Sequence, residues 1–110
     1  KGRISFSKAV ELCATNPSKL FGLDDQKGAI RVGLDADIVI YDPEKEFTIT
    51  NDKMHGDTDH TIWEGIELKG YPEATYCRGN LVFKDGEFLG KRGAGKRVKC
   101  HKLHFDGPSL

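Results

Sequence analysis

The stretch KGAIRVGLDADIVIYDP, residues 27–43, decides the fold class of this chain. Its centre, Ala36 to Tyr41, is apolar except for Asp37, and Ile38 to Ile40 are three consecutive β-branched residues. A half-exposed strand alternates apolar and polar residues, whereas a strand covered on both faces is continuously apolar. The stretch therefore predicts a central strand that is buried on both faces.

Glycine and proline mark the ends of the strands in this stretch. Two glycines flank the short alternating run Ala29–Val32, in which Ile30 and Val32 are expected to share one face. The pair Asp42-Pro43 is expected to close the central strand, because proline cannot donate a ladder hydrogen bond and restricts the residue before it.

Two helices are expected before the central stretch. Ser5 or Ser7 is suited to cap the first helix, which should end near Thr15. Asn16-Pro17 then resembles a new N-cap followed by proline at the first helical position, and Gly22 is placed to end this second helix. The apolar positions of the first helix are Phe6, Val10, Cys13 and Ala14.

Short strands are expected after the central stretch. Residues 46–50 (EFTIT) alternate and predict a strand, residues 51–64 are polar and predict a loop, and residues 65–72 predict a turn-rich connection. A meander should follow, with strands at Thr75–Cys77, Leu81–Phe83 and Glu87–Leu89 joined through Arg78-Gly79-Asn80 and Asp85-Gly86. Short strands with helices at one end predict part of an antiparallel or mixed β-sandwich.

The composition describes an ordinary soluble chain. Its 110 residues form one domain at most, with 17 Lys+Arg balanced by 17 Asp+Glu. This balance gives no support to a nucleic-acid partner. No apolar run approaches the ~20 residues of a membrane span, so no membrane association is predicted.

The cysteines and the N-terminal residues bear on the cellular compartment. Cys13, Cys77 and Cys100 are an odd number without a C-x-x-C pair, so a disulfide framework is not expected and a reducing, cytoplasmic setting is predicted. The start, Lys1 to Ser5, lacks the apolar core of a secretory signal and an initiator Met. This start fits a chain that begins within a longer protein.

The central stretch resembles the strand with which many amidohydrolases re-enter their small β domain after the catalytic barrel. The closest subgroup is the cyclic-amide hydrolases, namely dihydropyrimidinases and D-hydantoinases. The matching pattern is Gly28-x-Ile30-x-x-Gly33-x-Asp35-Ala36-Asp37-Ile38-Val39-x-x-Asp42-Pro43. Three further stretches agree: Thr15–Leu23 (TNPSKLFGL), Trp63-Glu64-Gly65, and Arg78–Val82 with Asp85-Gly86. The chain is identified by this resemblance, from about Lys1 to Val98, as the C-terminal part of such an enzyme.

The resemblance implies a domain organisation. Residues 1–23 would be a helical segment from the end of the catalytic barrel, residues 24–90 part of a composite β-sandwich domain, and residues 91–110 a basic C-terminal tail. The fold is thus expected to be mainly β with N-terminal helices, and the (β/α)8 barrel to be absent from this chain. The helices would then lack the partner for their apolar faces.

The resemblance also implies an activity. A cyclic-amide hydrolase opens a dihydropyrimidine or hydantoin ring to an N-carbamoyl amino acid, using a hydroxide bound to two divalent metals, zinc being expected, that share a carboxylated lysine. The implied setting is pyrimidine catabolism by a cytoplasmic homotetramer. The implied partners of this chain are the remainder of the enzyme, with its barrel and N-terminal strands, and further copies of the same protein.

The residues of this chain do not suggest a metal site of their own. The family's His-x-His pair is absent, His55 and His60 lie in a polar loop, and His101 and His104 lie in a basic tail. Cys100 with the tail histidines lacks a second ligand cluster at compatible spacing. The histidines are therefore interpreted as surface residues, and no metal-ligating or cofactor-binding residue is predicted.

No catalytic residue is predicted either. Asp35 and Asp42 border a strand, where aspartate accepts backbone hydrogen bonds, and Asp37 would need a partner if buried. Cys13 lies on an apolar helix face and is expected to be an inert core thiol. Trp63 is expected either to anchor its loop on the sheet or to contact another chain or domain.

Two other functions stay open. The first is a non-catalytic, dihydropyrimidinase-related scaffold that keeps the fold and serves in protein interactions. The second is a free-standing binding module, supported only by the tail from Lys91 to His104, with six Lys/Arg and no acid. This tail is expected to be extended and to become ordered only against another surface, with Leu103 and Phe105 as anchors and its cations meeting an acidic patch.

Overall fold

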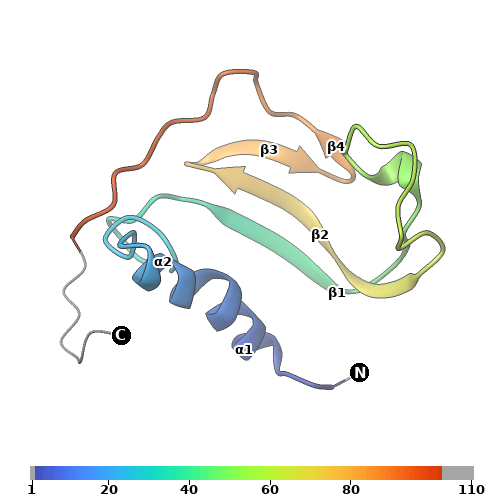
Figure 1. Cartoon of the computed structure of the whole chain (residues 1–110), viewed down its shortest axis with the longest axis horizontal. Helices are drawn as coiled ribbons and strands as arrows, with labels where there is room; N and C mark the ends of the chain where they lie inside the picture. The colour runs from blue at the N-terminus through green and yellow to red at the C-terminus, as the bar shows by residue number, and fades with distance from the viewer. Residues whose placement is uncertain (1, 103–110) are drawn as a thin grey trace. The chain divides into compact units, whose positions relative to one another are not determined.

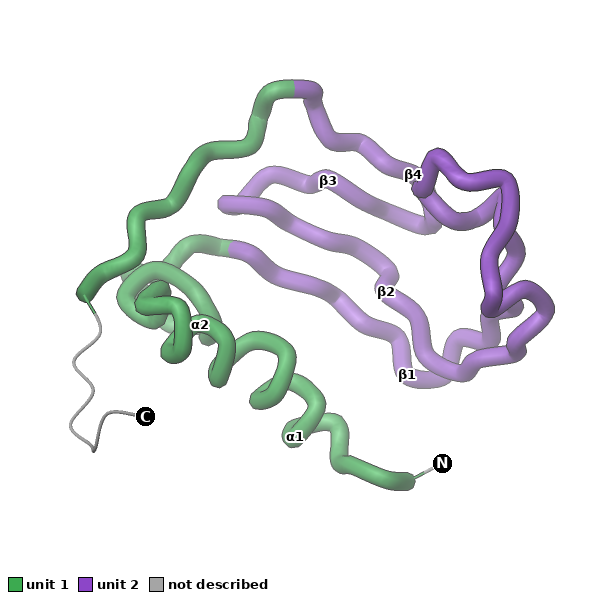
Figure 2. The backbone as a smooth tube through the Cα atoms, in the orientation of Figure 1, with its two compact units in different colours: residues 1–36, 93–110 green, residues 37–92 purple. Residues whose placement is uncertain are grey.

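A computed structural model of the chain describes residues 2–102. The chain divides into two compact units, one containing residues 1–36 and 93–110 and the other residues 37–92 (Figure 2). The first unit contains the helices and the second contains the sheet. The division at residues 23 and 90, which was taken from the resemblance, stays a prediction.

The second unit is a four-stranded antiparallel sheet with strand order β1-β2-β3-β4 (Figure 1). The strands are β1 (Ile38–Thr48), β2 (Glu67–Cys77), β3 (Asn80–Lys84) and β4 (Glu87–Phe88). A short 3-10 helix, η2 (Asn51–Lys53), lies in the connection between β1 and β2. This antiparallel sheet with an N-terminal helical segment confirms the predicted fold class.

Two tight turns set the register of the meander. Arg78 and Gly79 have φ of 47° and 78°, and Asp85 and Gly86 have φ of 49° and 85°. Cys77 pairs with Asn80 across the first turn. Two-residue hairpin loops with positive φ at both positions match the right-handed twist of the flanking strands. The predicted meander and its turns are therefore confirmed.

The pairing of β1 with β2 differs from the prediction. The Asp42-Pro43 pair does not end the strand, because β1 continues to Thr48 after a register shift between Asp42 and Glu46. Likewise, residues 65–72 are not simply a turn-rich connection, since β2 begins at Glu67. At a bulge, extra residues of one strand have no partner in the ladder, and pairing resumes beyond them. One irregular strand, β1, therefore replaces the two shorter strands that the sequence predicts.

Proline and glycine are tolerated in β2 for positional reasons. Pro72 pairs with Tyr41 of β1, whereas β3 pairs with β2 only from Ala74 onward. Pro72 therefore needs no ladder hydrogen bond toward β3. Gly70 has a φ of 98° and lies opposite the register shift, where a residue without Cβ allows the irregular backbone.

The prediction that the central strand is covered on both faces is wrong for this structure. Val39 is 57% exposed and Ile40 46% exposed, and Ile38 is half-buried. Among residues 2–102, Ala74 is the one apolar residue classed as buried, at 5% exposure. A continuous apolar run is suited to a strand between two layers, but the second unit provides one sheet, so a large share of the run stays in water.

Aromatic side chains form the main packing within the second unit. The rings of Phe47 and Tyr71 stack with centroids 4.4 Å apart, and Phe83 lies 6.3 Å from Tyr71. His55, from the loop after η2, contacts the edges of this cluster at Phe83 and Phe88, with centroids 6.2 and 6.5 Å away. The predicted polar loop therefore packs partly against the sheet.

The first unit begins with one helical run from residue 6 to residue 20. It consists of α1 (Phe6–Val10), the π-helical turn η1 (Glu11–Thr15) and α2 (Asn16–Leu20). The Oγ of Ser5 accepts the Lys8 N–H at 3.1 Å, so the predicted cap is confirmed.

The predicted break between two helices at Thr15 and Asn16 is wrong. Asn16 is helical, and its N–H donates to the Glu11 carbonyl, five residues earlier. Pro17 has no N–H and would crowd the carbonyl four residues before it, and the wider π turn relieves this crowding. Gly22, with a φ of 66°, follows the run and ends it, as predicted.

The residues after the helix form loops. Ala29–Val32 forms no strand, and Ile30 and Val32 are both exposed, so the prediction that they share one face stays a prediction. Instead, the Asp35 N–H donates to the Gln26 carbonyl at 2.9 Å, and the Lys27 Nζ pairs with the Asp35 carboxylate at 2.8 Å. These contacts close a loop. The four alternating residues do not form a strand there, because no neighbouring strand among residues 2–102 pairs with them.

The tail from Gly90 to Lys102 has no helix or strand, as predicted. The tail was expected to become ordered only against another surface, and residues 99–101 form hydrogen bonds with the loop after α2 of the same chain. The expected anchors Leu103 and Phe105 lie outside the described residues.

Candidate functional site

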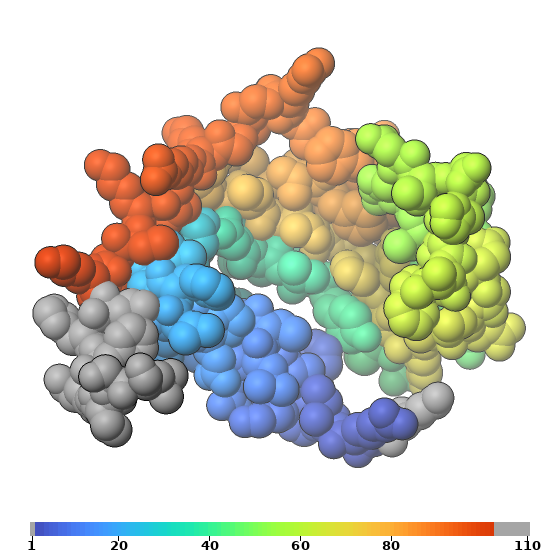
Figure 3. All heavy atoms as spheres, in the orientation of Figure 1, coloured from blue at the N-terminus to red at the C-terminus, as the bar shows by residue number. Residues whose placement is uncertain are grey.

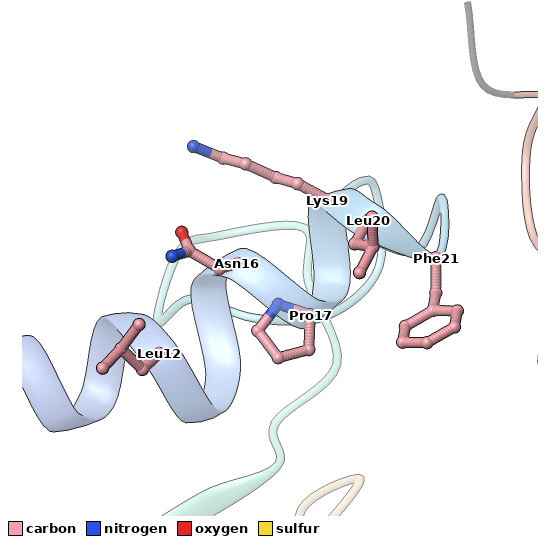
Figure 4. A pocket seen from close by; sticks show the side chains of 6 residues that line it. All are labelled: Leu12, Asn16, Pro17, Lys19, Leu20 and Phe21. Atoms are coloured by element: carbon pink, nitrogen blue, oxygen red, sulfur yellow. The ribbon is translucent and has the colours of Figure 1, made fainter. Parts of the chain in front are cut away.

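A shallow groove lies along the end of the helical run (Figure 4). It has a volume of about 530 Å³. Its lining residues are Leu12, Asn16, Pro17, Lys19, Leu20 and Phe21. The apolar members are contributed by η1, α2 and the following turn. Four of these six residues are apolar, so the groove is suited to binding an apolar surface.

Further large apolar side chains of the helical run outside the groove are also exposed. Phe6 is 64% exposed and Phe21 62% exposed, although both are large apolar residues. Figure 3 shows the helical run, in blue, open to the viewer on one face. Large contiguous apolar patches on soluble proteins mark contact surfaces. We call this set the helix surface; it contains Ile4, Phe6, Val10, Leu12, Leu20 and Phe21.

The second unit has its own exposed apolar residues on both faces of its sheet, since successive strand residues point to opposite sides, and we call this set the sheet surface. Its members are Val39, Ile40, Tyr41, Ile66, Leu68 and Phe88. Trp63 is also half-exposed, and its backbone N–H donates to the Thr61 Oγ1 at 3.3 Å. The sequence pattern identified the apolar residues of β1 but not their exposure, which depends on what is packed against them.

Each of the three aspartates of the central stretch has a structural partner. The Asp37 Oδ1 accepts the Arg78 N–H at 2.8 Å, and the Asp42 Oδ1 accepts the Glu44 N–H at 2.9 Å. Asp35 forms the ion pair with Lys27. These contacts support the structural interpretation of the three carboxylates.

The histidines are dispersed over the chain. His55 contacts the aromatic cluster, and the His60 Nδ1 lies 2.7 Å from the Asp59 Oδ1. The His101 Nε2 lies 2.6 Å from the Asp24 Oδ1, whereas His104 lies outside the described residues. Within residues 2–102, no group of three or more His, Cys, Asp or Glu side chains is arranged to hold a metal ion. The described residues therefore do not fit the two-metal group that the resemblance implies.

The Asp24–His101 pair joins two side chains that are distant in the sequence of the first unit. The hydrogen bond to His101 lowers the pKa of Asp24 below its ordinary 3.8, and the same hydrogen bond raises the pKa of His101 above 6.5. Sequence reasoning missed this pair, because the residues are 77 positions apart and neither belongs to a motif.

The cysteines of the chain are all free. Cys13 is exposed, so the prediction of a buried core thiol is wrong. The helical face on which Cys13 was placed is not covered in this structure, which explains the difference. No helix in the described part of the chain is long and apolar enough to span a membrane.

Comparison with known proteins identifies the class of this fold. The model of the amidohydrolase family matches residues 1–83, about three quarters of the sequence. The chain therefore belongs to the amidohydrolase family.

Within this family, the most similar relatives include D-hydantoinases. A D-hydantoinase of Ralstonia pickettii is 44% identical over 102 residues, which cover 93% of this chain and 22% of the relative. A D-phenylhydantoinase of Escherichia coli is 42% identical over 98 residues, covering 89% and 21%. The chain thus spans about a fifth of the length of the relatives it matches.

Solved structures give the same result. A D-hydantoinase structure superposes with a TM-score of 0.88 at 44% identity, covering 92% of this chain and 22% of the other. The dihydropyrimidinase from Brevibacillus agri NCHU1002 superposes with a TM-score of 0.86 at 39% identity, covering 90% and 22%. The recognised resemblance to D-hydantoinases and dihydropyrimidinases is therefore confirmed.

Proposed function

We propose that this chain is the structural C-terminal segment of a metal-dependent cyclic-amide hydrolase of the hydantoinase and dihydropyrimidinase type. The observation that carries the proposal is the 44% identity to a D-hydantoinase over 93% of the chain. The parent protein would open a hydantoin or dihydropyrimidine ring to an N-carbamoyl amino acid. Zinc binding, a homotetramer, a cytoplasmic location and a role in pyrimidine catabolism are parts of the same proposal.

In this proposal the segment contributes contact surfaces and no catalytic group. The helix surface would pack against the catalytic barrel, and the sheet surface against the other strands of the composite β-sandwich. Burying a Phe or Leu side chain stabilises a protein by about 1.5–3 kcal/mol relative to leaving it exposed. The exposure of Phe6, Phe21, Val39 and Ile40 supports such packing. While these side chains stay in water they contribute little to the stability of the fold, and burial against another surface would add to it.

The test compares the intact gene product that contains this chain with the 110-residue chain alone. Hydrolysis of hydantoin and dihydrouracil is measured together with bound metal. The proposal expects ring opening by the gene product, loss of activity on chelation, recovery with added zinc, and no hydrolysis by the chain alone. Ring opening by the 110-residue chain would contradict the structural role.

A non-catalytic scaffold is the alternative function. It predicts a gene product that folds and assembles but hydrolyses neither compound at any metal concentration.

A variant of the gene product with Phe6→Ser and Phe21→Ser separates a contact role from a catalytic one. In the proposed enzyme it should reduce stability and activity together, whereas the matched variant Ile30→Ser should change both less.

A further inference from the structure

Residues 99–101 of the tail lie against the loop that follows α2. The His101 N–H donates to the Gly22 carbonyl at 2.8 Å, and the Gln26 Nε2 donates to the Lys99 carbonyl at 3.0 Å. The His101 ring contacts the Asp24 carboxylate at 2.6 Å. Three hydrogen bonds from one short segment thus hold the tail to residues 22–26, which we call the receiving loop.

Both ring nitrogens of His101 face acceptors. Nε2 lies 2.6 Å from the Asp24 Oδ1, and Nδ1 lies 3.1 Å from the Lys102 carbonyl oxygen. A neutral imidazole carries one N–H and can satisfy only one of these acceptors, whereas the imidazolium donates from both nitrogens. The geometry therefore suits the protonated ring.

We propose that His101 is a proton-dependent latch, which fastens residues 99–101 to the receiving loop when its ring is protonated and loosens them when the ring is neutral. Deprotonation removes the attraction between the imidazolium charge and the Asp24 carboxylate, and it leaves only one of the two ring hydrogen bonds. The Gln26 and Gly22 contacts remain, so the segment loosens without losing all of its contacts. This inference concerns the tail and does not depend on the proposed function.

The charges around the ring support this direction. Asp24 and Asp25 of the receiving loop both favour the imidazolium and raise the pKa of His101, while Lys19 of α2 acts on Asp24 and helps to lower its pKa. Lys102 contributes its carbonyl oxygen, which also favours the charged ring.

The sign of the pH dependence follows from these shifts. The stabilisation from His101 is complete below pH 6.5, the ordinary pKa of the ring, and is lost as the pH rises through the raised value. The contribution of Asp24 is lost only when the pH falls below 3.8 toward its lowered pKa. The latch is therefore closed in mildly acidic solution and loosens on the alkaline side.

The expected effect is modest, because the two side chains are 42% and 44% exposed. Exposed ion pairs of this kind change an equilibrium by up to about fivefold. The equilibrium in question is that between the fastened and the loosened segment 99–101. It is measured by hydrogen exchange of the His101 amide, which donates to Gly22. The exchange rate at each pH is divided into the intrinsic rate at that pH to give a protection factor.

The experiment measures this protection factor in the intact gene product from about pH 5.5 to about pH 9, across the range in which histidine titrates. A Cys100→Ser background removes the neighbouring thiol from the titration. The wild-type latch should lose about two- to fivefold protection across this range. His101→Gln should remove the pH dependence, and Asp24→Asn should move it to lower pH.

The matched control is His60→Gln. His60 pairs with the adjacent Asp59 at 2.7 Å and is also exposed, but it holds no distant segment. This control should leave the protection of the His101 amide unchanged at every pH. Protection that stays constant with pH in the wild-type protein, or a pH dependence that persists in His101→Gln, would overturn the proposal. A ring titration by NMR that shows the same pKa for His101 in wild type and Asp24→Asn would overturn it as well.

Discussion

The meander β2–β3–β4 and the helical run of residues 6–20 acquire their structures in different ways. The meander is set by two turns of two residues each, and its strands satisfy one another's backbone groups. The helical run satisfies its own backbone but leaves its large apolar side chains in water. Local chemistry is thus sufficient to explain the meander, whereas the helical run has the composition of an element that packs against something else.

The difference shows where sequence rules are sufficient. Turn residues act on their immediate neighbours, so their effect is the same in a segment and in a whole protein. Burial depends on distant residues, so it changes with whatever covers the surface. Substitutions in the two units can test this contrast, beginning with the largest effect.

The largest effect is expected for Gly28→Ala in the first unit. Gly28 has a φ of 91°, and a Cβ there would lie 2.5 Å from the Cβ of the buried Ser18, whose backbone is fixed in α2. Left-handed strain and overpacking together should reduce the free energy of unfolding by about 3–5 kcal/mol in urea denaturation. The control Gly33→Ala has a φ of 94° but open space around its Cβ, so it should cost only about 1–2 kcal/mol. Equal costs for both variants would show that the helical run does not pack on its own loop.

A smaller effect is expected for Gly70→Ala in the sheet. Gly70 has a φ of 98°, and its Cβ would lie 2.7 Å from the Cζ of Tyr41. The Tyr41 ring is partly exposed and can turn away, so the expected loss is about 2–3 kcal/mol. The matched variant Gly65→Ala has open space and should lose about 1–2 kcal/mol. A loss for Gly70→Ala no larger than for Gly65→Ala would indicate that the β1–β2 irregularity is not tightly packed.

The smallest effect is expected for truncation of the central strand in this chain. Ile38 is half-buried and Ile40 is 46% exposed, so Ile38→Ala and Ile40→Ala should each cost about 1 kcal/mol, the first more than the second. A strand covered on both faces would instead lose roughly 2–5 kcal/mol. The same variants in the intact gene product should reach that larger value, because the proposed function covers the sheet surface there. A loss of only about 1 kcal/mol in both the chain alone and the intact gene product would contradict the proposal that another layer covers the sheet surface.

Much of the fold was predictable from local residues. The Ser5 cap, the helix end at Gly22, the turns at Arg78-Gly79 and Asp85-Gly86 and the strands beside them all follow from short-range chemistry. The same holds for the partner of Asp42, since aspartate at a strand end accepts nearby N–H groups, whereas the partner of Asp37 lies 41 positions away.

The errors occur where a local signal competes with its surroundings. Pro17 and Pro43 were both interpreted as boundaries, but a π turn accommodates the first and a register shift accommodates the second. The exposure of Cys13 depends on which surfaces are covered. The Asp24–His101 contact joins residues 77 positions apart, too far for any local sequence pattern to reveal it.

The position of β1 at the edge of the sheet has a consequence for handling this chain. One side of β1 pairs with β2, and within residues 2–102 no strand pairs with its other side beside Ile38, Val39 and Ile40. Apolar edge strands with high β-propensity act as templates for other strands. Pro43 and the register shift interrupt only the later half of this edge. At high concentration the chain is therefore expected to aggregate through residues 38–40, and a charged substitution there, such as Val39→Lys, should improve its yield as a soluble protein.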